Sequence, residues 1–502
     1  MKRDNRPFIH RNADLIRQES VMSLQALAII LFFVSPFSAC QTSNPDLVKE
    51  EIPYTIVRLC TPCHGEDLKG NIAQSLLDGS WQFGARPTDI FRAIKFGNPQ
   101  AGMPSWGGLL SDSDIDTLVS YLLRAEKRQG LSRPPIPSTL ETQDYQIQIE
   151  VLAEGFDRPW GIAFIDSNRA LVTEQSGQLR IVENDELRKD PVKGLGAVLG
   201  RGQGGLFDVV VDPNFEENGW VYISMTHSLG DKETDERKQA RLAPMMTKVI
   251  RGRISANHWT DEQVLFEAPH QTYISGGSHF GGRMIIDTDG YLFFSIGDRD
   301  SINHAQDLSR PNGKIHRIHA DGTIPLSNPF YGQEKAILSI YSYGNRNPQG
   351  LALHPQTGEL WSTEHGPLGG DELNIILSGV NYGWPVICHG INYNGELISE
   401  FTHQEGMEQP IYYWRPSIAP CGLDFYRGDL FPKWKNRLLL GSLKQEELQL
   451  LNIKDQRVIY NETILKNVGR IRQVITGPEG AIYILLNRPG ALLRLTPDSV
   501  QI

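Results

Sequence analysis

The 502-residue sequence predicts a small all-α domain followed by an all-β six-bladed β-propeller. Residues 44–128 have apolar side chains at helical spacing, which predicts the all-α domain. Residues 145–502 instead have short apolar runs separated by turns, which predicts strands. The stretch between them, 129–144, is rich in proline and lacks periodicity, so we expect it to be a linker.

Three helices are expected in the all-α domain, over 47–59, 88–95 and 111–123. The last begins with Ser111-Asp-Ser-Asp, a sequence typical of a helix N-terminus. Its apolar residues recur on one face, at Ile115, Leu118, Val119 and Leu122. This spacing is that of a helix packed on a core.

A pattern of two apolar strands joined by a polar turn recurs in the second part. Its copies start at Gly161, Leu206, Gly282, Gly350, Gly422 and Arg472. Their spacing of roughly fifty to eighty residues predicts propeller blades with long loop insertions. A large β-sandwich is the alternative, and the repetition of strand pairs favours blades.

The N-terminal residues have the features of an export signal. Basic residues lead the sequence, an apolar run covers 24–34, and small residues precede Cys40. Because this run is short for a membrane span, we expect a signal peptide over 1–40 and a periplasmic location. Lipidation of Cys40, which would anchor a lipoprotein to the membrane, stays open because Phe37 is a poor match to that signal. The net charge of −10 argues against a nucleic-acid partner.

Cys60-Thr-Pro-Cys63-His64 places two thiols three residues apart, with a histidine beside the second. This motif is typical of covalent haem c attachment, with His64 as an iron ligand. A zinc site would need a second ligand pair, and residues 65–130 contain no further Cys or His. A redox dithiol would need a βαβ context, which is missing here.

Met103 is expected to be the sixth iron ligand. It lies in Ala-Gly-Met-Pro-Ser-Trp, a loop bounded by glycine and proline, and no other methionine lies between the haem motif and the linker. A methionine that only packs the loop is the alternative. In its helices and motifs, the segment 44–128 resembles a class I cytochrome c, which implies ligation by His64 and Met103 and one-electron transfer.

Cys388 and Cys421 are not explained by the haem motif or the leader. In an oxidising compartment they could pair as a disulfide. The alternative is that both are buried small apolar residues. The sequence leaves the two interpretations open.

Polar residues gather near strand ends of the predicted propeller. Gln203 lies in a Gly-Gln-Gly-Gly turn, where the backbone can approach a ligand closely. His279 lies between glycines that leave it accessible, as a general base requires. Arg346 and Asn347 supply a guanidinium and an amide side by side. Three cations follow late in the chain, Lys444, Arg470 and Arg472. Taken one at a time, such residues are more often structural or solvated.

Together these residues lie in segments with a distinctive order. The longest are His279-Phe-Gly-Gly-Arg, Arg346-Asn-Pro-Gln-Gly-Leu-Ala, Glu364-His-Gly-Pro-Leu-Gly-Gly-Asp-Glu-Leu-Asn and Asn381-Tyr-Gly-Trp-Pro. Over nearly all of 148–497 the chain resembles the soluble quinoprotein sugar dehydrogenases, the family of soluble glucose dehydrogenase and aldose sugar dehydrogenase. The resemblance implies a six-bladed propeller that uses pyrroloquinoline quinone (PQQ) and calcium.

The resemblance also implies roles for the polar residues. His279 would take the proton from the C1 hydroxyl of an aldose while hydride passes from C1 to PQQ. Arg346 would stabilise the negative charge that develops on the quinone oxygen. The carboxylates and carbonyls of PQQ would be bound by Gln203, Asn347, Lys444, Arg470 and Arg472. Such a cage suits a tricarboxylate inside an acidic protein.

Calcium sites follow from the same resemblance. The backbone carbonyls of Gly366 and Pro367 would hold the catalytic calcium. A second, structural calcium would lie near Glu372 and Tyr382. Two neighbours depart from the family pattern: Asn345 stands where His is common, and Ser278 stands where an acidic residue or His often precedes the base. These departures could change the substrate preference.

The predicted function is that of a periplasmic quinohaemoprotein dehydrogenase. It would oxidise an aldose at C1 and pass electrons from PQQ to the fused haem c, and then to a periplasmic or membrane acceptor. A non-catalytic binding propeller tethered to a cytochrome is one alternative. An enzyme acting on a sugar-derived aldehyde or another polyol is a second.

Overall fold

The computed structural model describes residues 53–70, 73–77, 81, 87–97, 103–129, 135–200, 202–230 and 243–498. The leader predicted over 1–40, with Cys40, lies outside the described residues, as does the first part of the helix expected over 47–59.

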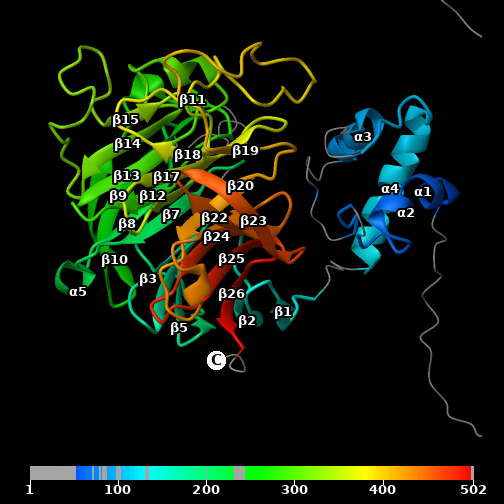
Figure 1. Cartoon of the computed structure of the whole chain (residues 1–502), viewed down its shortest axis with the longest axis horizontal. Helices are drawn as coiled ribbons and strands as arrows, with labels where there is room; N and C mark the ends of the chain where they lie inside the picture. The colour runs from blue at the N-terminus through cyan, green and yellow to red at the C-terminus, as the bar shows by residue number, and fades with distance from the viewer. Residues whose placement is uncertain are drawn as a thin grey trace, which may run out of the picture. The chain divides into compact units, whose positions relative to one another are not determined.

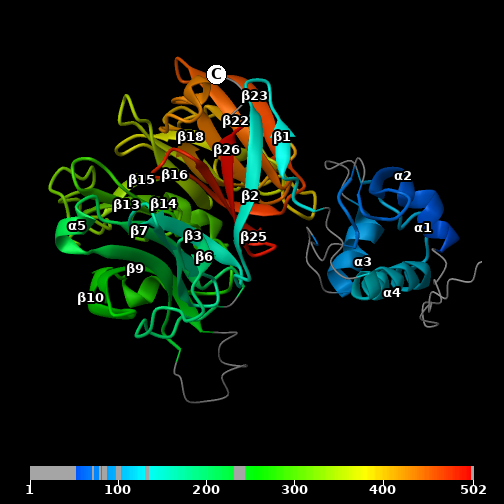
Figure 2. The same ribbon diagram turned by 90° about the horizontal axis from the view of Figure 1, so that it is seen from below.

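The N-terminal part is helical where it is described (Figure 1). Its helices are α1 (Tyr54–Leu59), α2 (Thr61–His64), α3 (Pro87–Phe96) and α4 (Asp112–Gln129). The Ser111 hydroxyl donates to the Asp114 carboxylate at 2.6 Å and accepts from the Asp114 amide at 3.2 Å, so α4 begins with the expected cap. The four apolar residues expected on one face of α4 are all buried. Figure 2 shows α3 beside α4.

The remainder forms six antiparallel sheets, which are the blades of the predicted propeller. Blade 1 contains β3 (Pro159–Phe164), β4 (Arg169–Glu174), β5 (Leu179–Glu183) and β6 (Glu186–Leu187). Blade 2 contains β7 (Leu206–Val211), β8 (Val221–Ser228), β9 (Pro244–Ser255), β10 (His258–Phe266) and β11 (Ile274–Ser275). Blade 3 contains β12 (Met284–Ile286), β13 (Tyr291–Ile296), β14 (Lys314–His319) and β15 (Ile340–Tyr343).

The other blades have the same order of strands. Blade 4 contains β16 (Pro348–Leu353), β17 (Leu360–Glu364), β18 (Asp371–Ile376) and β19 (Tyr412–Trp414). Blade 5 contains β20 (Pro420–Phe425), β21 (Leu438–Ser442), β22 (Glu447–Lys454) and β23 (Arg457–Lys466). Blade 6 contains β24 (Arg470–Thr476), β25 (Ile482–Arg488), β26 (Ala491–Pro497), β2 (Gln146–Glu154) and β1 (Thr139–Glu141). Each of the repeated strand pairs expected from the sequence is confirmed as the first two strands of a blade.

The first strands of the blades pack in a closed ring around one axis, in the order β3, β7, β12, β16, β20 and β24. The first strands β3, β7, β16 and β20 are largely buried; every residue of β20, for example, is buried. Burial on both faces explains why such strands are short apolar runs in the sequence. In β23, the outermost strand of the blade that contains β20, only Ile464 and Leu465 are buried. The core therefore lies between the faces of neighbouring blades.

Blade 6 joins the two ends of the propeller sequence. β2 pairs antiparallel with β26, with Gln148 opposite Thr496 and Val151 opposite Leu493. Figure 2 shows the cyan β2 alongside the red β26. Hydrogen bonds between the first and last long strands thus close the ring. β1 forms within the stretch that we expected to be a linker and pairs with β2.

Short helical turns lie in the loops of the propeller. They are α5 (Phe215–Asn218), η2 (His270–Thr272), η3 (Ile302–Gln306) and η4 (Pro432–Trp434). None of the helices in the described ranges is long and apolar enough to span a membrane. Cys388 and Cys421 are free and buried, so the structure supports buried thiols and not a disulfide between them.

Candidate active site

The predicted site residues of the propeller gather because of the blade topology. Gln203, His279 and Arg346 each lie just before the first strand of a blade. Gly366 and Lys444 each lie just after a second strand. Because the strands of a blade are antiparallel, both kinds of position lie at the same end of the sheets. One end of the propeller axis therefore collects nearly all of the candidates.

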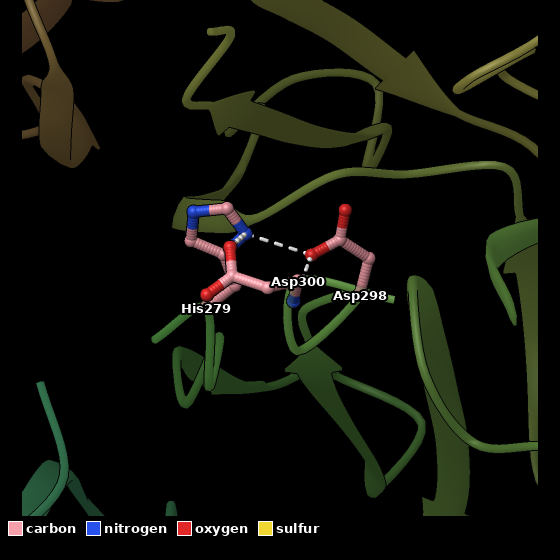
Figure 3. Close-up of side chains that lie close together, drawn as sticks. All are labelled: His279, Asp298 and Asp300. Atoms are coloured by element: carbon pink, nitrogen blue, oxygen red, sulfur yellow. Dashed lines mark hydrogen bonds and ion pairs between the residues drawn. The ribbon is translucent and has the colours of Figure 1, made fainter. Parts of the chain in front are cut away.

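Two carboxylates approach the same ring nitrogen of His279 (Figure 3). Its Nδ1 is 2.7 Å from Oδ1 of Asp298 and 3.2 Å from Oδ1 of Asp300. Donation from Nδ1–H to these oxygens assigns the tautomer in which Nε2 keeps its lone pair. The side chain is 11% exposed, so Nε2 is sheltered but not sealed. This imidazole is arranged to accept a proton.

Asp298 follows β13 and is fully buried. Its Oδ2 accepts the indole N–H of Trp384 at 2.8 Å, and its backbone N–H donates to the Arg346 carbonyl at 2.8 Å. Burial alone would raise the pKa of Asp298, but the hydrogen bond and charge of His279, with Arg346 and Trp384, lower it. Asp298 is therefore an anion that orients the imidazole and stabilises its protonated form.

Our sequence reasoning missed Asp298 and its neighbours. The available signal was the charged run Gly297-Asp298-Arg299-Asp300 directly after an apolar strand. Arg299 and Asp300 both have positive φ, 59° and 58°, as does His279 at 48°. Adjacent left-handed residues also form the two-residue hairpin turns at Asn184-Asp185, Ala256-Asn257 and Asp455-Gln456. It is therefore the contacts of this turn with His279, and not its φ angles, that make it part of the site.

Gln203 holds the backbone of the base. Its Oε1 accepts the N–H of His279 at 2.8 Å, and its own N–H donates to the Gly277 carbonyl at 2.7 Å. A side chain at Gly202 would place a Cβ only 2.5 Å from that carbonyl oxygen. We predicted that glycine in this turn lets the backbone approach a ligand. In the structure, Gly202 instead lets the backbone approach the loop at Gly277.

Arg346 is the second predicted catalytic residue, and it lies near the base. Its Nη1 donates to the carbonyls of His365 and Gly366 at 3.0 and 2.8 Å. Its guanidinium lies 5.4 Å from the centre of the Trp384 ring. Trp384 therefore contacts both the partner of His279 and Arg346, and it brings the two predicted catalytic residues into one cluster.

Asn347 and Arg472 are joined through Gln349. Gln349 donates to Oδ1 of Asn347 at 3.2 Å and accepts from Nη1 of Arg472 at 2.9 Å. Burial, together with the charge of Arg472, lowers the pKa of Arg470 to about 10. Burial also lowers the pKa of Lys444. Cations that are crowded and buried in this way are stabilised by an anionic ligand.

Arg472 gives a direct test of the predicted cofactor. Its Nε is buried and has no hydrogen-bond partner among the described residues. A buried donor without an acceptor indicates a group that the protein itself does not supply. Together with Lys444 and Arg470, this donor fits a ligand with several carboxylates, as PQQ is.

Glu364, which is buried, and Glu372, which is half-buried, are the acidic residues of the predicted calcium region. They accept hydrogen bonds from Asn345 at 3.0 Å and Asn374 at 3.1 Å, respectively. Burial raises the pKa of Glu364 to about 7. Burial and the charge of Glu364 raise the pKa of Glu372. The amide oxygens Oδ1 of Asn345 and Asn374 are buried without partners among the described residues.

The carboxylate oxygens of Glu364 and Glu372 and the unpartnered amide oxygens beside them suit a hard cation at the predicted structural calcium site. Tyr382, the other expected ligand residue, is buried, and its hydroxyl donates to the Ile375 carbonyl. At the predicted catalytic calcium, Gly366 donates its N–H to Asp371 at 2.8 Å. A Cβ on Gly366 would lie 2.3 Å from Gly370, so the turn that presents its carbonyl requires glycine.

Of the two departures from the family pattern, Asn345 has a local explanation, because its side chain binds Glu364. At Ser278 the hydrogen bond from Arg299 is accepted by the backbone carbonyl and does not depend on the side chain. Asp298 orients the His279 ring, a role that a different residue at 278 or 345 could have had.

The haem motif folds as one helical turn. Cys60 ends α1, and the amide of His64 donates to the Cys60 carbonyl at 2.9 Å. Nδ1 of His64 is 2.6 Å from the Gln74 carbonyl oxygen. Donation from Nδ1–H to this oxygen leaves the lone pair of Nε2 free to bind a metal. Burial lowers the pKa of His64 and so favours the neutral ring that iron requires. Burial and the neighbouring Cys63 raise the pKa of Cys60 to about 11. Met103 is half-buried.

Comparison with known proteins agrees with this geometry. Residues 156–494 match the model of the family described as glucose / sorbosone dehydrogenase. The chain belongs to this family. Residues 50–122 match the family described as cytochrome C oxidase, cbb3-type, subunit III. The expected resemblance, a PQQ-dependent sugar dehydrogenase domain after a cytochrome c domain, is thereby confirmed.

Individual relatives cover almost the whole propeller. The chain is 38% identical over 369 residues to the aldose sugar dehydrogenase YliI of Escherichia coli (strain K12), covering 72% of this chain and 96% of that protein. The apo crystal structure of the soluble aldose sugar dehydrogenase from Escherichia coli has a TM-score of 0.64 at 36% identity, covering 70% of this chain and 99% of that one. Cytochrome c55X of Pseudomonas aeruginosa is 30% identical over 101 residues, which are 20% of this chain and 84% of that protein.

Proposed function

We propose that this family member is a PQQ-dependent dehydrogenase that oxidises the C1 hydroxyl of an aldose sugar. The single observation that carries the proposal is the His279–Asp298 pair, joined through Trp384 to Arg346. A base oriented by a carboxylate beside a guanidinium is what removal of a hydride and a proton from an alcohol requires. The relatives named as sugar dehydrogenases support an aldose as the substrate.

In the reaction, PQQ supplies the quinone that accepts the hydride from C1. His279 takes the hydroxyl proton at Nε2, because Asp298 holds the opposite nitrogen as a donor. The charge of Asp298 stabilises the imidazolium that results. Arg346 supplies positive charge where negative charge develops.

The remaining predicted residues hold the cofactors. PQQ would be bound by Gln203, Asn347, Lys444, Arg470 and Arg472. The carbonyls of Gly366 and Pro367 would hold the catalytic calcium, and Glu372 and Tyr382 would hold the structural one. The crowded cations and the unpartnered Nε of Arg472 support the first assignment. The carboxylates and unpartnered amide oxygens support the last.

The helical domain would carry electrons away from the propeller. Haem c would be attached at Cys60 and Cys63, with iron bound by His64 and Met103. The hydrogen bond from His64 to a backbone carbonyl supports this ligation. We further propose that 1–40 direct export to the periplasm, with Cys40 as a lipid anchor, and that a periplasmic or membrane acceptor receives the electrons.

The test uses the haem as an internal reporter. Full-length holoprotein is reconstituted with PQQ and Ca²⁺, and haem absorbance is followed as aldoses and simple alcohols are added. An aldose should reduce the haem, and His279→Ala should lower that rate by about 100- to 10,000-fold with an unchanged haem spectrum. His319→Ala, at a ring that packs on Tyr291 in the same blade, is the control and should keep the wild-type rate.

Three outcomes would contradict parts of the proposal. If the protein binds PQQ but no substrate changes the haem absorbance, the non-catalytic alternative is favoured. If His279→Ala keeps the wild-type rate, the base is another residue. Reduction by an aldehyde or polyol but not by an aldose would redirect the substrate assignment.

A further inference from the structure

The segment that carries His279 has an unfavourable backbone. His279 has φ 48°, and Gly276 and Gly281 have φ 132° and 66°. The segment joins two very short strands, β11 and β12. Glycines and short strands give it little stiffness of its own. Contacts from outside must hold it.

Arg299 provides such contacts from the turn that follows β13. Its guanidinium donates to the carbonyls of Ser278 and Gly276, the latter at 2.8 Å. It also lies 3.5 Å from the centre of the Phe280 ring. These contacts flank His279 on both sides in sequence. Gln203 binds the same segment at Gly277 and His279, so the segment is held from two blades.

Stability alone does not account for Arg299. The residue is 2% exposed, and burial lowers the pKa of its guanidinium to about 10. Its Nε is buried with no hydrogen-bond partner in the described part of the chain. Its backbone is left-handed, a conformation that costs free energy in a non-glycine residue. Buried charge, an unpaired donor and strain at one residue indicate a role other than stability.

We propose that Arg299 is a positioning residue that clamps the backbone on either side of His279. This proposal rests on the proposed role of His279 as the base. In this arrangement the turn at 298–300 acts on the base twice: Asp298 orients the imidazole, and Arg299 fixes the backbone that carries it. Without the clamp, Nε2 would lose its alignment with the substrate hydroxyl even though Asp298 remains.

A clamp and a merely structural arginine predict different results for Arg299→Met. A methionine of similar length fills the space over Phe280. It removes both the desolvation cost of the guanidinium and its attraction to Asp298 and Asp300, so the midpoint of urea unfolding should change little. The carbonyl of exposed Gly276 can bind water instead. If the role were structural, the unfolding midpoint would fall together with the activity.

The control is Arg317→Met. Arg317 belongs to the same blade and also lies over aromatic rings, at 4.7 Å from Tyr291 and 4.9 Å from Tyr341. It donates to Asn328 at 2.8 Å and takes no part in the candidate active site. Loss of this arginine should leave kcat unchanged.

Two readouts are measured on the full-length protein. In the form without PQQ, amide hydrogen exchange of peptides covering 274–281 should be at least about tenfold faster in Arg299→Met than in wild type or Arg317→Met. In the reconstituted form, kcat for aldose oxidation should fall by about 10- to 100-fold, with a smaller change in KM. Arg299→Lys should restore part of kcat, because an ammonium can donate to the same carbonyls without stacking on Phe280.

Unchanged exchange in 274–281, or unchanged kcat in Arg299→Met, would overturn the clamp. A fall in the unfolding midpoint that parallels the fall in kcat would overturn it too. Failure of the proposed function is distinguishable, because then either the wild-type protein oxidises no aldose or His279→Ala keeps the wild-type rate. The exchange measurement needs neither PQQ nor substrate and still tests the clamp.

Discussion

At the axis of the propeller, buried Arg283 is paired with a carboxylate, whereas buried Arg299, beside the loop of His279, is bonded to carbonyl oxygens. Arg283 donates to Asp208 at 3.0 Å, to the Gln349 carbonyl at 2.9 Å, and to Gln473. Its guanidinium also lies 4.2 Å from the centre of the Trp160 ring. These partners come from the first strands of blades 2, 4, 6 and 1. One side chain therefore links most of the ring.

The difference indicates what each region contributes. At the axis, opposite charges and hydrogen bonds from several blades satisfy one another, which is the arrangement that closes a ring of sheets. Around His279, left-handed backbone and an unpartnered Nε persist, and both cost free energy in the folded state. A second carboxylate also lies 3.2 Å from Nδ1 of His279. Substitutions at the axis should thus act on stability, and substitutions near the base should act on catalysis.

The largest expected effect is that of Arg283→Met. Removing the guanidinium leaves Asp208 buried without its partner, and burial already raises the pKa of that carboxyl. The free energy of unfolding should fall by about 3–5 kcal/mol. Urea unfolding measures this, with Arg494→Met as the control. Arg494 pairs with Glu150 and Asp185 at the surface, so its loss should cost about 1 kcal/mol or less. Equal effects of the two substitutions would remove the distinction between axis and surface.

The sequence predicted the blades because most of their first strands are largely buried and form recognisable apolar runs, as in β20. It also predicted that Gln203, His279 and Arg346 lie near strand ends. It did not predict the closing pair of β2 with β26, because pairing between the two ends of a ring leaves no local signal. Asp298 had a local signal, the charged run after an apolar strand, but its role did not: its hydrogen bonds to His279 and Trp384 join distant segments of the chain.

Lys314 extends the comparison to a buried cation that can lose its proton. Its Nζ donates to the carbonyls of His304, Ala305 and Asn312 at 2.7, 3.0 and 2.6 Å, and burial lowers its pKa to about 7. In the unfolded chain the lysine pKa is about 10.4. Between these values the unfolded chain binds more protons, so the lysine makes the free energy of unfolding rise with pH.

One proton contributes at most about 1.4 kcal/mol per pH unit to that slope. Lys314→Met should remove the contribution, so the difference in unfolding free energy between variant and wild type should change steadily from pH 7 to pH 10. Urea unfolding at pH 7, 8.5 and 10 measures the difference. A difference that is constant with pH would mean that Lys314 stays charged over this range.

The smallest expected effect separates strain from charge at Asp300. Asp300→Gly relieves the left-handed backbone at φ 58° and should raise the free energy of unfolding by about 0.5–1 kcal/mol. It also removes the carboxylate 3.2 Å from Nδ1 of His279, so kcat should fall severalfold while the unfolding midpoint rises. Asp300→Asn removes the charge but keeps a side chain that tolerates this conformation, so it should lower kcat without the gain in stability. If Asp300→Gly lost stability, the strain assigned to the base region would be wrong. The contrast with the axis would then rest on Arg299 alone.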